Sequence, residues 1–165
     1  MAIATDTQQT ALPALIELFS IDLSTTGQTS TIHRFQPSST ATISFGGNTY
    51  SWIPCEITGV AISSTTQATP TLAVSNVKMD YLASMVNFDD FLGAQLTYIK
   101  TFANQVNGQG SGERFSTRTY DIVALSAETK TSISFQLGTI LDRDSLKLPA
   151  RRATSDIIPG IGLSN

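Results

Sequence analysis

The stretch ATISFGGNTYSWIP, residues 41–54, carries the strongest local fold signal in this chain. Ile43 and Phe45 alternate with polar residues, as in a strand that has one face in a core. GGN then supplies residues that tolerate positive φ, and an aromatic-rich segment follows, so the stretch predicts a β-hairpin. Pro54 lacks a backbone N–H, and pairing should therefore end there or the strand should lie at an edge.

Strand-like segments lie on both sides of this hairpin. Ile133, Phe135 and Leu137 alternate with polar neighbours, which is typical of a sheet with one face in the core. Polar or glycine-rich connectors separate the segments, and a turn that starts at Asp89 should close at Gly93. Besides the hairpin, the predicted strands cover residues 14–23, 31–35, 56–63, 71–75, 94–102, 114–128 and 131–140.

One segment has the spacing of a helix. Apolar residues recur at helical intervals after Asn76, a residue type suited to the N-cap, so we expect one short α-helix near 77–86. The whole pattern predicts a mainly β fold: a single antiparallel β-barrel-like domain over residues 13–152, because closure would remove exposed strand edges. The helix would cover an open end of this barrel. Residues 1–12 would form a flexible N-terminal arm, and residues 153–165 a C-terminal tail.

Length and composition limit the possible functions. A chain of 165 residues suits one domain, and its net charge of −3 gives no reason to expect nucleic-acid binding. The charge is uneven, since residues 1–109 hold three basic and seven acidic groups while 110–165 hold seven basic and six acidic. The sequence shows neither a signal-peptide pattern nor a run of ~20 apolar residues that could span a membrane. We expect a protein made in the cytoplasm.

Few residues suggest catalysis or metal binding. His33 lies beside Arg34 in a short predicted strand, but no GxSxG-like elbow supplies a nucleophile, so a structural or surface histidine is favoured. Asp89 and Asp90 could hold a cation, yet no calcium-loop spacing follows, and a turn at a helix end is favoured. Cys55 is the one cysteine, which excludes an intramolecular disulfide and a multi-cysteine metal site within the chain; it should be packed rather than reactive.

Three other features allow both a functional and a plain structural interpretation. Asp142 and Asp144 could be the carboxylate pair of a glycoside hydrolase, but an exposed ion-pair cluster is favoured, because no aromatic sugar platform surrounds them. NGQGSGE, residues 107–113, lacks the Lys-Ser/Thr of a phosphate loop and is interpreted as a mobile loop. Arg151 and Arg152 form either a solvated turn or a docking point for a neighbour's carboxylates, and the sequence leaves both open.

The order of these features resembles the phage minor tail protein L family, the lambda-like tail-tip proteins. That family typically shows an early ELFE-D strand, a G--Y-P-P hairpin, a -P-L-V-N strand into a helix, a D-L-GA-V turn and a late LP-R signature. Related segments occur here in the same order, across about 140 residues. They lie at 15–23, 46–54, 70–76, 90–96 and 148–152.

The resemblance implies a structural component of the tail tip, or baseplate hub, of a long-tailed bacteriophage. Such a protein would join the distal tail ring to the central fibre or hub protein and help to adapt a six-fold tube to a three-fold tip. Its expected partners are copies of itself in a trimeric ring, the distal tail protein, the central fibre or hub protein and the tape-measure protein. It would be made in the host bacterial cytoplasm, reside in the virion at the tail tip, and act without enzymatic turnover.

The resemblance also bears on cofactors. Larger members carry a C-terminal cysteine-containing domain thought to hold an iron–sulfur cluster, and a cluster needs several thiolates. With Cys55 alone, this sequence predicts no cofactor. The chain would be a short form of the family, and the sequence leaves open whether another protein supplies the cluster domain.

Four residues are candidates for contacts with neighbours. The resemblance would put the turn after residue 86 at the barrel rim, where ring neighbours meet, so Phe88 and Phe91 are candidate interface anchors. The alternative is that both rings fill the subunit's own core. Arg151 and Arg152 are candidates for fixing a neighbour in register by charge-assisted hydrogen bonds, and the arm and tail would order on assembly.

Two other functions remain as alternatives. A carbohydrate-binding β-module that reads the host surface would need aromatic side chains exposed on one face, and Tyr50 and Trp52 are the pair close in sequence. A cell-wall hydrolase would need an acid/base pair, for which Asp142 and Asp144 are the candidates.

Overall fold

The computed structural model describes residues 13–27, 30–60, 69–75 and 89–138. Within these ranges the chain forms nine strands and three short 3-10 turns, and no α-helix. The predicted helix at 77–86, the arm 1–12 and the tail 153–165 lie outside them. The elements are β1 (Leu15–Asp22), η1 (Leu23–Thr26), β2 (Ile32–Gln36), β3 (Ile43–Phe45), β4 (Asn48–Trp52), β5 (Cys55–Thr58), β6 (Thr71–Ser75), η2 (Asp89–Phe91), β7 (Gln95–Phe102), η3 (Ala103–Gln105), β8 (Ser116–Glu128) and β9 (Ser132–Gly138).

The strands form one mixed sheet in the order β3-β4-β2-β1-β7-β8-β9-β6-β5. The prediction of a mainly β fold is confirmed, but the prediction of an antiparallel barrel is wrong in two respects. β2 and β4 are parallel, with Phe35 aligned with Ser51, and the sheet is not closed, since its strand order ends at β3 and β5. Alternation along a strand fixes which face each residue takes but carries no information about the partner strand.

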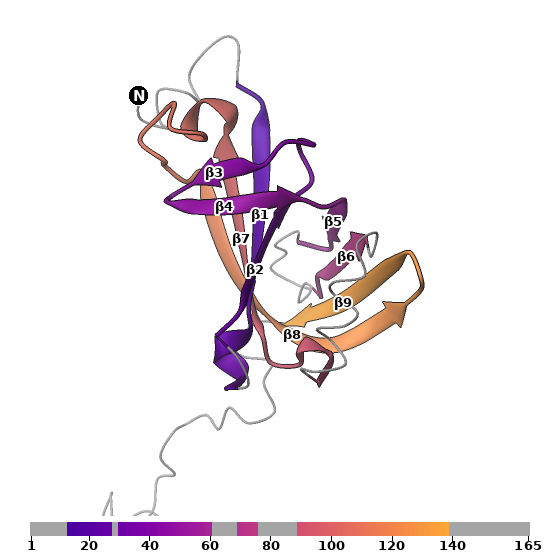
Figure 1. Ribbon diagram of the computed structural model, residues 1–165. Coiled ribbons are helices and arrows are strands. Elements are labelled where there is room, and N and C mark those ends of the chain that lie inside the picture. Colours follow the sequence, from indigo (N-terminus) through magenta and orange to yellow (C-terminus); the bar gives the residue numbers. More distant parts are fainter. Residues whose placement is uncertain (1–12, 28–29, 61–68, 76–88, 139–165) are drawn as a thin grey trace, which may run out of the picture.

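A very short piece of chain joins the two end regions of the sheet. Only Ile53 and Pro54 separate β4 from β5. The Ile53 N–H donates to the Gln36 carbonyl at 3.1 Å on the β2 side, whereas the Pro54 carbonyl accepts from the Ser75 N–H at 2.8 Å on the β6 side. The strand breaks at the proline, as the sequence predicts. The sheet must therefore curl, because two residues carry the chain from one end of the strand order toward the other (Figure 1).

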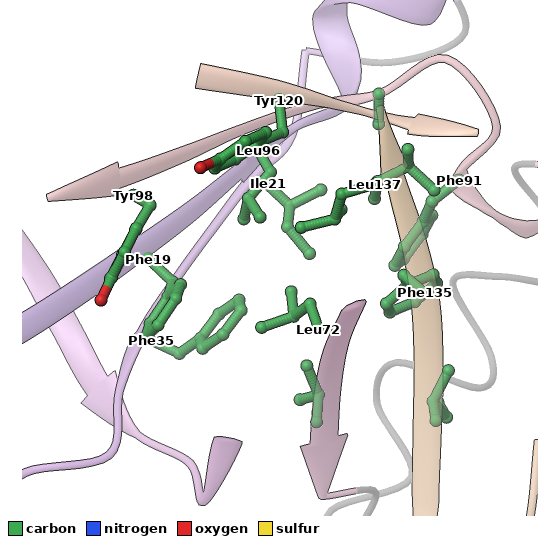
Figure 2. Close-up of a cluster of buried hydrophobic side chains, with 14 of the residues drawn as sticks. Phe19, Ile21, Phe35, Leu72, Phe91, Leu96, Tyr98, Tyr120, Phe135 and Leu137 are labelled. Carbon is green, nitrogen blue, oxygen red and sulfur yellow. The ribbon is translucent and has the colours of Figure 1, made fainter. Parts of the chain in front are cut away.

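The larger hydrophobic cluster lies on the inner face of this curl, and we call it the main cluster. Figure 2 shows the Phe19, Phe35 and Tyr98 rings side by side, with ring centroids 4.9 Å apart for Phe19 and Tyr98. Residues from every strand except β3 and β4 belong to the main cluster or pack against it. Its buried residues are Phe19, Ile21, Leu23, Phe35, Ile53, Leu72, Val74, Phe91, Ala94, Leu96, Tyr98, Tyr120, Ile122, Ile133, Phe135 and Leu137.

A smaller cluster uses the opposite face of β1 and β7, and we call it the second cluster. Leu18 and Ile99, paired across these strands, alternate with the main-cluster residues and so point the other way. The β3–β4 hairpin crosses over this face in Figure 1 and covers it with Ile43, Phe45 and Tyr50. The sequence predicts the hairpin but not its position over a second core.

The other predicted strands are confirmed within one or two residues at the ends that the structure describes, except after β5. The sequence predicts that this strand continues to residue 63, whereas β5 ends at Thr58 and Gly59 follows with φ +72°. An added Cβ on Gly59 would lie 3.0 Å from the Thr69 carbonyl oxygen, so both the turn and the close approach favour glycine.

Candidate functional site

The turn at η2 contains two consecutive non-glycine residues in the left-handed region of the backbone. Asp90 and Phe91 both have positive φ, 55° and 60°, a conformation that costs a non-glycine residue about 1–3 kcal/mol. The Phe91 ring is fully buried, with its centroid 5.9 Å from that of Phe135 and 5.8 Å from that of His33. Figure 2 shows the Phe91 and Phe135 rings together in the main cluster. Burial of the ring therefore holds the turn in its strained conformation.

Phe91 is the one of the four candidate interface residues that lies within the described ranges. Phe91 fills the core of its own subunit, which is the alternative that the sequence left beside the interface role. Phe88, Arg151 and Arg152 lie outside the described residues, as do Asp142 and Asp144.

Neighbouring hydrogen bonds hold the same turn as a structural unit. The Gly93 N–H donates to the Ile122 carbonyl at 2.9 Å, and the Thr25 hydroxyl donates to the Gly93 carbonyl at 3.2 Å. In the part of the chain that the structure describes, no three His, Cys, Asp or Glu side chains are grouped as metal ligands. His33 packs its ring against Phe91 from β2, in agreement with the structural interpretation of this histidine.

A polar cluster that the sequence analysis missed lies at one end of the main cluster. The Tyr98 hydroxyl donates a hydrogen bond to Glu17 Oε1. Lys100 Nζ lies 3.4 Å from the same oxygen and 5.4 Å from the centre of the Tyr98 ring. Glu17 and Lys100 are aligned across β1 and β7, so only the strand pairing could have revealed the contact.

Burial raises the pKa of the Tyr98 phenol, and the hydrogen bond to Glu17 raises it further. Burial likewise raises the pKa of the Cys55 thiol to about 12, with the negative charge of Glu17 as the second cause. Both groups are therefore protonated at neutral pH. Since the thiolate is the nucleophilic form of cysteine, Cys55 is chemically quiet, as the sequence predicts.

The two aromatic residues of β4 have different environments. Tyr50 is buried in the second cluster, whereas Trp52 is 38% exposed. They do not form the exposed aromatic platform that a sugar-binding face needs.

The loop after β7, interpreted from the sequence as mobile, is tied to the rest of the domain near both of its ends. Asn107 Oδ1 accepts from the Ser44 N–H at 2.8 Å, and the Asn107 N–H donates to the Ser44 carbonyl at 2.8 Å. Thr101 Oγ1 donates to the Glu113 carbonyl at 2.7 Å at the other end of the loop. Asn107 thus binds the β3 edge of the sheet, which was not apparent because its partner is 63 residues away in sequence.

The described contacts serve to pack and hold the domain. A comparison with known protein families identifies the family to which the domain belongs. The profile of the family described as phage minor tail protein L matches residues 24–160. The chain belongs to this family. It is a phage tail component, and hence part of the virion, in a family of structural proteins. No curated protein matches the chain.

The phage minor tail protein L motifs can now be placed on the structure. Segment 15–23 precedes the matched range, while 46–54 and 90–96 lie within it. Gly46 and Gly47 have positive φ in the hairpin loop, and Gly93 has φ +77° in the η2 turn, followed by the fully buried Ala94. The described motif residues of these two segments thus fix backbone turns and core packing. No helix in the described ranges is long and apolar enough to cross a membrane.

Proposed function

We propose that this tail protein is a tail-tip hub component of a long-tailed phage, joining the distal tail ring to the central fibre or hub protein. The family match over residues 24–160 carries the proposal. In this role the protein forms a trimeric ring that helps to adapt the six-fold tube to a three-fold tip. The distal tail protein, the central fibre or hub protein and the tape-measure protein are its other partners.

The described surface supports a role in assembly. Leu15, at the start of β1, is 44% exposed and is aligned with Phe102 across β7. Phe115 is 49% exposed and its ring centroid lies 5.6 Å from that of Phe102. Exposed apolar side chains gathered at one end of a domain are typical of contact surfaces in assemblies.

The carbohydrate-binding alternative has less support. Trp52 is accessible, but the burial of Tyr50 removes the second ring that would stack on a sugar. Retention of the purified protein on a glycan column, lost in Trp52→Ala, would favour this alternative over the hub.

The hub proposal is tested on the particle itself. A cryo-EM map of the virion should show this curled sheet at the tail tip in three copies, between the distal tail ring and the central fibre protein. Particles from a phage that lacks the gene should stop before tip completion. Density for the chain along the tail tube, or normal tips without it, would contradict the proposal.

The candidate interface residues outside the described ranges have a separate test. We propose that Arg151 and Arg152 bind carboxylates of a neighbour and that Phe88 anchors the ring, while residues 1–12 and 153–165 order on assembly. Changing both arginines to Ala should weaken co-purification with the partner proteins without changing thermal unfolding of the isolated chain. Lys130→Ala, in the exposed turn before β9, is a control for the loss of a positive charge elsewhere on the chain. An equal effect of both variants would exclude a specific role for the arginine pair.

A further inference from the structure

The outer edge of β5 carries main-chain hydrogen-bonding groups that pair with none of the described strands. Because Pro54 pairs with Ser75, alternation along the β5–β6 ladder directs the main-chain groups of Glu56 and Thr58 toward β6. The N–H and C=O groups of Cys55 and Ile57 consequently point away from β6. Among the described strands, none pairs with this side of β5. The opposite end of the sheet differs, since Asn107 there binds both main-chain groups of Ser44.

The side chains of β5 define what could pair with this edge. Cys55 and Ile57 pack against the main cluster, while Glu56 and Thr58 are exposed on the other face. An added strand must therefore place apolar residues at alternate positions next to Cys55 and Ile57. A basic residue between them would lie opposite the Glu56 carboxylate, and opposite charges on facing residues stabilise a strand pair.

The segment SLKLP, residues 145–149, has this pattern. In an antiparallel alignment, Leu146 lies opposite Ile57, Lys147 opposite Glu56 and Leu148 opposite Cys55. The next residue, Pro149, then falls opposite Pro54, at a position where the edge requires no hydrogen bond from the added strand. The side-chain polarity, the charge and the missing proline N–H all agree with this one antiparallel register between residues 146–149 and residues 54–57.

The direction and length of the chain allow this pairing. β9 runs parallel to β5, because both are antiparallel to β6, so the chain leaves Gly138 at the end of the sheet where β5 also ends. A strand that starts there and runs back is antiparallel to β5. It must cross three strand spacings of about 4.8 Å each. The six residues 139–144 can span about 20 Å.

We propose that residues 145–148 of the same chain bind the outer edge of β5 as an antiparallel strand. This inference is independent of the tail-tip role, since it depends only on the β5 edge and the sequence that follows β9. Leu146 and Leu148 extend the main cluster, and Lys147 pairs with Glu56. Arg151 and Arg152 then leave the sheet at the Pro54 end of β5.

The native cysteine permits a direct test on the full chain. Leu148→Cys places a second thiol opposite Cys55, where the Cα separation of about 5.5 Å in a hydrogen-bonded antiparallel pair allows a disulfide. Mild oxidation with copper phenanthroline should convert this variant to a disulfide-linked monomer with loss of both free thiols. Lys147→Cys is the matched control, because its side chain points to the other face, and it should form no disulfide with Cys55 of the same chain.

Three results of this experiment would overturn the proposal. They are covalent dimers in place of monomers, equal oxidation of the two variants, and free thiols retained in a Leu148→Cys protein whose circular dichroism matches the wild type. The first would assign the β5 edge to the tail of a second copy.

Hydrogen exchange on the unmodified sequence gives a measurement that does not depend on a cysteine variant folding. The amides of Cys55 and Ile57 should be protected in the wild type. They should lose protection in Lys147→Glu and regain it in Lys147→Glu combined with Glu56→Lys. Fast exchange of both amides in the wild type would also overturn the proposal.

Discussion

The main cluster and the second cluster lie on opposite faces of β1 and β7, and they are assembled in different ways. The main cluster joins residues from Phe19 to Leu137, including strands that are far apart in sequence. The second cluster is covered by one hairpin whose strands are adjacent in sequence, with Val106 from the loop beyond β7. A local hairpin can thus be predicted from its own residues, whereas the surface that it covers depends on distant pairings.

The largest expected effect comes from the main cluster. Phe135→Ala removes a fully buried ring that contacts Phe91, and it should lower the free energy of unfolding by about 3–5 kcal/mol. The strained η2 turn depends on the same packing, so the substitution also removes support for that turn. Urea denaturation followed by far-UV circular dichroism measures the change. A loss smaller than that of the Ile43 variant below would contradict the ranking of the two clusters.

A second-cluster substitution should have a smaller and more local effect. Ile43→Ala should cost about 2–3 kcal/mol, since the residue is buried but lies on an end strand of the sheet. Trp52 is the one tryptophan and lies on β4, so its fluorescence reports on the hairpin. We expect the fluorescence transition to precede the circular dichroism transition in this variant. Coincident transitions would show that the hairpin and the main cluster unfold as one unit.

The hydrogen bond from the Ser44 N–H to Asn107 Oδ1, which ties the loop to the hairpin, should contribute less to stability than either buried side chain. Asn107→Gly keeps a residue that tolerates φ of 55° but removes the acceptor of the Ser44 N–H, which should cost about 1 kcal/mol. Asn107→Asp is the control, because it retains Oδ1 and should keep most of the stability. Faster hydrogen exchange at Ser44 in the glycine variant alone would confirm the origin of the loss.

The smallest effect at neutral pH concerns Cys55. Its pKa is raised in the folded state from 9.0 to about 12, mainly by burial, so between these values the unfolded chain loses the thiol proton first. The contribution of the protonated Cys55 thiol to the free energy of unfolding is therefore intact below about pH 9 and is lost as the pH rises toward 12. Cys55→Ala should show a shallower decline in urea midpoint from pH 8.5 to 10.5 than the wild type. Parallel declines would exclude ionisation of the thiol as a cause.

Much of the fold follows from the sequence, for identifiable reasons. The Gly46–Gly47 turn, the break at Pro54 and the alternation of Ile133, Phe135 and Leu137 are local features, and the structure confirms all of them. The parallel β2–β4 pair and the open strand order depend on which segments meet, and alternation does not encode that. The Glu17–Tyr98–Lys100 cluster could not be predicted for the same reason, because it depends on the pairing of β1 with β7.

The order of the motifs carries the family resemblance, and the structure shows what two of those motifs do. The glycines of 46–54 and 90–96 allow turns, and Phe91 is a core residue in the second of them. When only the sequence is known, an aromatic residue in a turn can be either an exposed anchor or a core residue, and both were open for Phe91. The sequence could not decide between them, because the burial depends on contacts with Phe135 and His33, from β9 and β2.

The two-residue link between β4 and β5 has a mechanical consequence. Ile53 and Pro54 can span no more than about 10 Å, so the hairpin and the β5–β6 ladder cannot be pulled apart while both remain folded. A force that peels strands away from the β3 end would reach this short tether and then act on the far end of the sheet as well. The domain should consequently resist tension as a single body, with a rupture event in place of gradual unzipping.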